Sequence, residues 1–84
     1  MPFMVIERFR NGDVRPIGER FKESGRMPPE GVEYHASWVD TIGAGCFQVM
    51  GAPNPELLKV WIGRWDDLID FEVIPVVASS EFWS

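Results

Sequence analysis

The residues that most often carry chemistry are scarce in this chain. Its 84 residues include one cysteine, Cys46, and one histidine, His35. One cysteine cannot form an internal disulfide, and one cysteine with one histidine cannot complete a tetrahedral zinc site. We therefore predict no disulfide framework, no metal and no cofactor, and a reducing compartment fits this cysteine usage best.

Basic residues are also few. The chain has 8 lysines and arginines against 13 aspartates and glutamates, which gives a net charge of −5, and the basic residues are scattered along it. Binding to nucleic acid or to an anionic membrane surface requires a concentrated basic face. We expect neither nucleic acid nor a membrane as a partner.

Long apolar runs are missing as well. The opening stretch, MPFMVIERFR, has only a short apolar run before its charges begin. A signal peptide needs a basic start and a longer apolar stretch, and a membrane span needs about 20 apolar residues. We therefore expect a cytoplasmic protein.

The composition is that of one small globular domain. The chain is 45% hydrophobic and 25% charged, and it has four tryptophans and six phenylalanines. A domain of this length has a thin core, and such domains often gain stability from a partner subunit. We predict a single domain over residues 1–84, with residues 79–84 as a tail.

Hydrophobic periodicity and turn residues predict six elements. Strands are expected at 3–9, 32–40, 46–51 and 70–78, and helices within 11–25 and 52–69. Asn11 or Asp13 can cap the first helix, and Gly25 can end it. Asn54 followed by Pro55 is a typical start for the second.

This order of elements predicts an α+β fold. With right-handed crossovers it gives a ferredoxin-like βαββαβ sandwich, in which two helices cover one face of a four-stranded antiparallel sheet of order 4-1-3-2. Pro75 cannot donate a hydrogen bond within a sheet, so its strand must lie at an edge. The predicted order places that last strand at an edge.

Three blocks of the sequence point to a known family. ESGRMPPEGVEYHASWV, CFQVM and WIGRWDDLIDFEVIPVVAS occur in this order and cover most of the chain. In these blocks the chain resembles an uncharacterised bacterial family of domains of unknown function (family 3303). The resemblance implies a ferredoxin-like fold of the dimeric α/β-barrel type, and it implies no reaction.

Alternation along the strands assigns side chains to the two faces of the sheet. We expect Arg8 near Cys46 and paired with Glu72, Met4 near Met50, and His35, Ser37 and Val39 opposite Met50, Gln48 and Cys46. The face that the helices leave open is then apolar enough to form a homodimer. The residues predicted for that interface are Met4, Ile6, Met50, Ile74 and Val76, with Phe82 and Trp83 reaching across.

His35 is the natural candidate for acid–base catalysis, because histidine exchanges protons readily near neutral pH. No carboxylate or nucleophile is predicted beside it, which favours a position at a subunit contact or at the edge of a cleft. If a cleft holds a small apolar or aromatic ligand, the predicted contacts are Tyr34, His35, Trp38 and Gln48.

Other motifs have simpler explanations. Cys46 could be a nucleophile, but a buried cysteine on a strand is the more common case. Asp66, Asp67 and Asp70 are similar to an aspartate-rich metal motif, although a solvated helix end is favoured because hard metals need more oxygen ligands. The segment 43–45 fits a hairpin tip, since it lacks the lysine and helix of a phosphate loop. Trp61 and Trp65 could line a pocket, but their spacing favours the core.

Two functional hypotheses remain. The first is a dimeric ligand-binding or interaction module without catalysis. The second is a cofactor-free enzyme, similar to small monooxygenases or isomerases that act on aromatic or polyketide-like compounds. The first is favoured because His35 lacks a partner, and fold analogy alone is weak support for the second.

Overall fold

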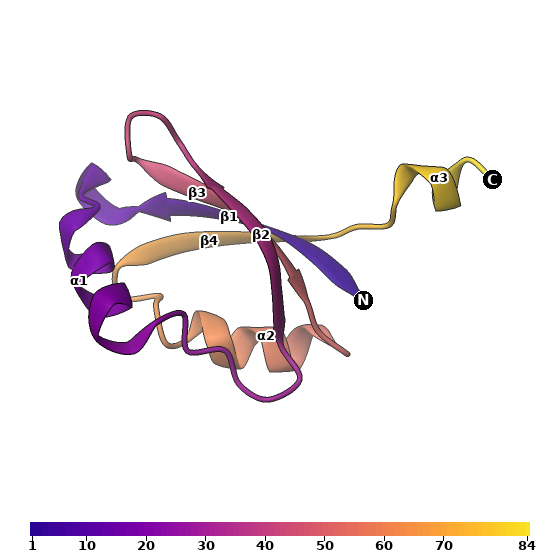
Figure 1. Ribbon diagram of the computed structural model, residues 1–84, viewed down its shortest axis with the longest axis horizontal. Coiled ribbons are helices and arrows are strands. Elements are labelled where there is room, and N and C mark those ends of the chain that lie inside the picture. Colours follow the sequence, from indigo (N-terminus) through magenta and orange to yellow (C-terminus); the bar gives the residue numbers. More distant parts are fainter.

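An antiparallel sheet of four strands forms one layer of the protein, as the computed structural model of residues 1–84 shows (Figure 1). The elements in chain order are β1 (Pro2–Phe9), the 3-10 turn η1 (Arg10–Gly12), α1 (Arg15–Ser24), β2 (Glu33–Val39), β3 (Gly45–Gly51), α2 (Pro55–Ile62), β4 (Ile69–Pro75) and α3 (Ser79–Phe82). The strand order is β2-β3-β1-β4. The predicted ferredoxin-like α+β fold is confirmed, and the Pro75 strand lies at an edge.

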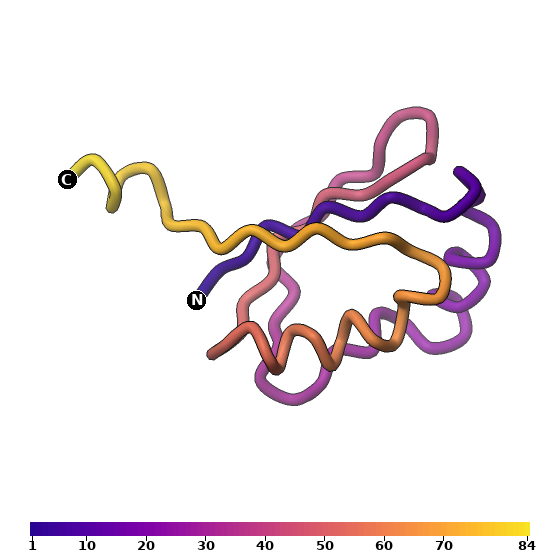
Figure 2. The backbone as a smooth tube through the Cα atoms, turned by 180° about the vertical axis from the view of Figure 1, so that it is seen from behind, coloured from indigo at the N-terminus to yellow at the C-terminus, as the bar shows by residue number.

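Helices α1 and α2 form the second layer on one side of the sheet (Figure 1, Figure 2). The short helix α3 stands apart from both layers at the end of an extended segment (Figure 1). None of the helices has both the length and the apolar character needed to cross a membrane.

The helix boundaries follow from local chemistry. The side chain of Asn54 accepts a hydrogen bond from the backbone N–H of Leu57 at 2.8 Å and caps α2, as predicted. Helix α2 ends at Ile62, earlier than expected, and turns replace its last predicted residues. The N-cap of α1 is Val14, which makes no side-chain capping bond, so neither Asn11 nor Asp13 holds the predicted cap position; the Asp13 carboxylate accepts the backbone N–H of Arg15 at 3.1 Å. Gly25 ends α1 with a φ of 66°, as predicted.

The register between β1 and β3 differs from the prediction by one residue. Met4 lies opposite Val49 and Arg8 opposite Gly45, whereas the expected partners were Met50 and Cys46. A shift of one residue moves every side chain of a strand to the other face of the sheet. The predicted faces of β3 were therefore wrong.

In the structure, Cys46, Gln48 and Met50 point toward the helices, because they pair with the inward-facing residues of β1. Met50 has no exposed surface and belongs to the core. It cannot take part in a contact through the open face, so its assignment to the dimer interface was wrong.

The hairpin of β2 and β3 is partly as predicted. The pairs Ser37–Gln48 and Val39–Cys46 are confirmed, but an irregularity at His35 places Tyr34 opposite Met50. Trp38 pairs with Phe47, and both lie on the open face. On the same face, Arg8 and Glu72 lie side by side on β1 and β4, 3.5 Å apart, as predicted.

The dense part of the core lies beneath α2. The five largest side chains that are fully buried are Trp61, Phe3, Met50, Leu58 and Val5. Helix α1, in contrast, contributes no buried residue. The space between α1 and the sheet is therefore less completely filled, and the candidate site lies there.

Candidate functional site

A cavity of about 290 Å³ lies between α1, the sheet and the end of α2. Its walls are mostly apolar and aromatic, formed by Phe9, Val14, Ile17, Phe21, Trp61 and Trp65. Four polar side chains also line it: Glu7, Arg26, Ser37 and Gln48. An apolar hollow with a few polar groups is the usual form of a small-molecule site.

Glu7 is the most unusual of these polar residues. It lies on β1 between the buried residues Val5 and Phe9, and only 5% of its surface is exposed. Burial raises the pKa of the Glu7 carboxyl group to about 7, although the hydrogen bond from Gln48 and the charge of Arg26 act in the opposite direction. This carboxyl group can therefore gain or lose a proton near neutral pH.

Gln48 and Arg26 connect Glu7 to the rest of the polar cluster. The amide Nε2 of Gln48 donates to the Glu7 carboxyl group, and Nε of Arg26 donates to Oε1 of Gln48 at 3.4 Å. Nη2 of Arg26 donates to the hydroxyl oxygen of Ser37 at 3.2 Å. The Ser37 and Tyr34 hydroxyl groups are 2.8 Å apart, and the Arg26 guanidinium lies over the Tyr34 ring at 3.7 Å.

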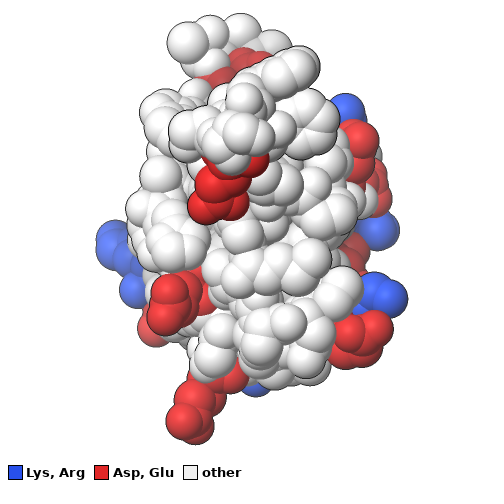
Figure 3. All heavy atoms as spheres, turned by 90° about the vertical axis from the view of Figure 1, so that its right-hand side faces the viewer, with Lys and Arg blue, Asp and Glu red and all other residues white.

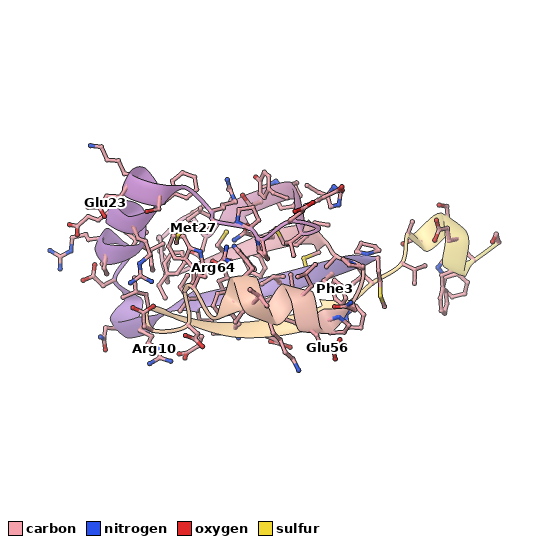
Figure 4. All side chains as sticks on the ribbon, turned by 90° about the horizontal axis from the view of Figure 1, so that it is seen from below. Phe3, Arg10, Glu23, Met27, Glu56 and Arg64 are labelled. Atoms are coloured by element: carbon pink, nitrogen blue, oxygen red, sulfur yellow. The ribbon has the colours of Figure 1, made fainter.

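Two tryptophans of the helix layer hold Arg26 in place. The indole Nε1 atoms of Trp61 and Trp65 both donate to the backbone carbonyl of Arg26, each at 2.9 Å. Trp61 lies in the last turn of α2 and Trp65 in the turns that follow the helix, and the shared carbonyl shows that both indoles face the loop after α1. Nearby, Nη1 of Arg64 donates to the carbonyl of Met27 at 2.6 Å (Figure 4). The loop after α1 is thus fixed to the helix layer by side-chain donors.

A bidentate ion pair attaches α1 to the turn that follows α2. Nη1 and Nη2 of Arg20 each donate to a carboxylate oxygen of Asp67 at 2.7 Å. This hydrogen bonding lowers the pKa of Asp67. Asp70 pairs instead with Arg10 at 3.3 Å, so these two aspartates each face a separate arginine. No three residues among histidine, cysteine, aspartate and glutamate are grouped so as to hold a metal ion.

The structure does not bring the four predicted ligand contacts together. Gln48 lies in the cavity, and Tyr34 touches its polar cluster through Ser37 and Arg26. Trp38 lies on the opposite face of the sheet and is 61% exposed. His35 is exposed and lines a separate hollow beside Gly51. His35 therefore lies outside the cavity that contains Glu7.

Glu7 was not among the residues predicted for the site, although the sequence contained a signal for it. In FMVIERF, strict alternation puts Glu7 on the same face as Phe3, Val5 and Phe9. A carboxylate in the middle of an inward-facing apolar row is uncommon, and it marks a candidate functional residue. The residues of β1 alone therefore suffice to find it.

Cys46 also lines the cavity and is buried. Burial, and to a lesser extent the nearby Glu7 carboxylate, raise the pKa of the thiol to about 11. The nucleophilic form of cysteine is the thiolate, so this thiol is poorly suited to covalent catalysis at neutral pH.

Fold and site together define a class: a ferredoxin-like α+β domain with an apolar cavity between its helices and its sheet, and a buried acid in the cavity wall. The chain belongs to the family described as a domain of unknown function, DUF3303, whose model matches residues 1–84. No curated protein and no solved structure matches it.

Proposed function

We propose that this protein binds a small, largely apolar molecule in the cavity beneath α1. The observation that carries the proposal is the hydrogen-bonded cluster of Glu7, Gln48 and Arg26 in the wall of an otherwise apolar hollow. Buried polar side chains with a purely structural role are commonly surrounded by other protein atoms. The side chains of Glu7, Gln48 and Arg26 instead line a cavity beside aromatic residues. The geometry suits recognition of an apolar body that carries one hydrogen-bonding group.

The walls indicate the shape and charge of the ligand. Phe9, Phe21, Trp61 and Trp65 offer aromatic surfaces, which favour a flat ring system. At the polar end Arg26 supplies a positive charge, and Glu7 can be neutral or negative near pH 7. A neutral ligand with a carbonyl or hydroxyl group fits this balance. The ligand must be small, because the cavity of about 290 Å³ lies at the lower end of the size range of ligand pockets.

Gly18 offers a direct test of the site. It lies on α1 in the cavity wall, and a Cβ atom added there meets no atom within 4 Å. Gly18→Leu is expected to fill part of the cavity, and replacing a helical glycine also favours the helix by up to about 1 kcal/mol. The variant is expected to fold well and to bind poorly.

The probe for this test is 2-naphthol, which combines an aromatic body with one hydroxyl group. Calorimetric titration is expected to show saturable binding to the wild type and to Gly18→Ala, which gains the helix propensity without filling the space. Binding to Gly18→Leu is expected to be at least tenfold weaker. Equal binding by all three proteins would place the ligand elsewhere.

We also propose that two copies of the protein associate through the sheet face that α1 and α2 leave open. Two cross-strand rows on this face are mainly apolar. These rows are Trp38–Phe47–Ile6–Glu72 and Ala36–Val49–Met4–Ile74. Three of the predicted interface residues, Met4, Ile6 and Ile74, belong to them, whereas Val76 lies just beyond β4.

A second copy is the occupant that suits this surface best. A two-fold axis matches a patch to itself, and the neighbouring Arg8–Glu72 pair provides charges of both signs for reciprocal contacts. The C-terminal arm supports the same arrangement, because Phe82 and Trp83 are largely exposed and form an edge-to-face pair with each other. Figure 3 shows that uncharged side chains make up most of the end of the molecule carrying this arm, with several acidic ones among them and the basic ones at its sides.

Sedimentation velocity at micromolar concentration tests the association. The wild type is expected to sediment as a dimer, and Phe47→Lys as a monomer, because Phe47 is 44% exposed at the centre of the open face. Val60→Lys is the matched control, since Val60 is similarly exposed on α2. A wild-type monomer near 9.6 kDa would refute the dimer.

A further inference from the structure

We propose that Glu7 is a catalytic acid–base residue, which moves a proton on an enolisable aromatic ketone or aldehyde bound in the cavity. This inference rests on the proposed function, because it needs the ligand to lie beside Glu7. It adds a reaction and a substrate class to the binding site, and it requires no oxidant, reductant or cofactor.

One oxygen of the Glu7 carboxyl group is free to react. Oε2 accepts the hydrogen bond from Gln48, and no protein group donates to Oε1. No buried side-chain oxygen in the protein lacks a hydrogen-bond partner. Oε1 must therefore be accessible, and because Glu7 lines the cavity, a bound ligand can reach this oxygen.

The proton transfer balances within the site. The Glu7 carboxylate takes a proton from the carbon next to the substrate carbonyl. The C–H electron pair becomes the C=C bond of an enolate, and the π pair of the carbonyl moves to its oxygen. Return of the proton from Glu7 to the same carbon, or to a conjugated one, restores the carboxylate and releases the ketone or its double-bond isomer.

Arg26 is placed to stabilise the enolate oxygen. Its Nε and Nη2 atoms donate to Gln48 and Ser37, whereas its Nη1 atom makes no hydrogen bond to the protein. A positive donor fixed in advance near the developing negative charge is the usual device for this step. The two tryptophan donors on the Arg26 carbonyl hold its backbone in position before the substrate arrives.

The surroundings of Glu7 suit a base that works near neutral pH. Burial raises the pKa of its carboxyl group to about 7, a value at which one group can both accept and return a proton. The polar groups that face it are Gln48 and Cys46 on β3 and Arg26 on the loop after α1, and α1 presents only apolar side chains and Gly18 to the cavity. The site contains no second carboxylate that could act as the base.

The test follows proton exchange at carbon. The probe is 2-tetralone, an uncharged aromatic ketone, in deuterated buffer, and the loss of its α-proton signals is recorded by NMR. We expect the wild type to accelerate this exchange above the rate in buffer. Glu7→Gln is expected to lose about a hundredfold or more of the acceleration. Glu23→Gln, at an exposed position of α1 that does not line the cavity, is expected to match the wild type.

A pH profile keeps the test decisive if Glu7→Gln folds poorly. The wild-type exchange rate, corrected for buffer, is expected to rise with pH through a midpoint near 7 and then to level off. A profile without this midpoint would overturn the assignment of Glu7.

The outcomes also separate this inference from the proposed function. If 2-naphthol binds but 2-tetralone exchanges no faster than in buffer, or equally fast with Glu7→Gln, the catalytic role is wrong and the binding site stands. If 2-naphthol does not bind either, both proposals fail. Acceleration that depends on Glu7 supports both.

Discussion

The side-chain amide of Gln48 donates a hydrogen bond to the carboxyl group of Glu7, across the neighbouring strands β3 and β1. The two residues point to the helix side of the sheet and are both buried. An acid in such a position is costly in its charged form unless it is compensated. Gln48 and Arg26 offset part of the cost of burying the charged carboxylate. The part that they do not offset raises the pKa of Glu7.

The stability of the protein is therefore expected to fall as pH rises from about 5 to 8. The folded-state pKa of Glu7, about 7, lies above its ordinary value of 4.5, so the folded state holds a proton that the unfolded state has released. The stabilisation is complete below pH 4.5 and is lost as pH rises through 7. The difference corresponds to roughly 3 kcal/mol as an upper limit.

Urea unfolding at pH 5 and pH 8 measures this effect. Glu7→Gln is expected to remove most of the difference, and the control Glu23→Gln, at an exposed position of α1, to retain it. Arginine partners lower the pKa values of Asp13 and Asp67. Their contribution to stability is therefore lost as pH falls, and only in solutions more acidic than about pH 5. Stability that is constant or rising between pH 5 and 8 would contradict the buried state of Glu7.

The shared carbonyl of Arg26 predicts a non-additive pair of substitutions. Trp65→Phe or Trp61→Phe alone removes one donor and leaves the other, so each is expected to cost about 1 kcal/mol. The double variant leaves the carbonyl without a side-chain donor and is expected to cost more than the sum of the two. Denaturation of the four proteins measures the coupling, with Trp38→Phe as the exposed control. Simple additivity would mean that the two indoles do not share this oxygen.

His35→Ala is expected to leave the midpoint of thermal unfolding within a few degrees of the wild type, because the side chain is exposed. It is also expected to leave the exchange of 2-tetralone unchanged, since His35 lies outside the cavity of Glu7. Thermal scans and the NMR exchange measurement check both points. If His35→Ala folds but no longer accelerates the exchange, His35 rather than Glu7 would be the catalytic residue.

Which face of the sheet each β3 side chain occupies can be tested by truncating two adjacent residues that point to opposite faces. Met50→Ala is expected to destabilise the protein by about 2–5 kcal/mol, since the side chain is fully buried beneath the helices. Val49→Ala, on the open face, is expected to cost clearly less in the monomer. Chemical denaturation at low protein concentration compares them. A larger loss of stability for Val49→Ala than for Met50→Ala would contradict the observed register and favour the register predicted from the sequence.

The sequence was sufficient to predict the arrangement of the elements. Asn54 and Pro55 marked the start of α2, Pro75 marked an edge strand, and the order of elements gave the topology of the sheet. These signals are local, or they follow from general rules of chain connection. They do not depend on which residues of neighbouring strands lie opposite one another.

The site was harder to predict because it depends on that register. In β3, both Cys46–Gln48–Met50 and Phe47–Val49 can serve as an inward row, and bulk alone favoured the wrong one. Taking Glu7 as inward-facing with Phe3 and Val5 would have exposed the error, because a buried acid needs a polar partner such as Gln48. The contribution of Arg26 comes from a loop, whose position no periodicity determines.

The indole N–H signals of the four tryptophans test the location of the ligand site most directly. In two-dimensional NMR spectra with added 2-naphthol, the signals of Trp61 and Trp65 are expected to shift, because both line the cavity. The signals of Trp38, on the open face, and Trp83, on the C-terminal arm, are expected to stay in place. Shifts confined to Trp38 and Trp83, or no shifts at all, would contradict a ligand site beneath α1.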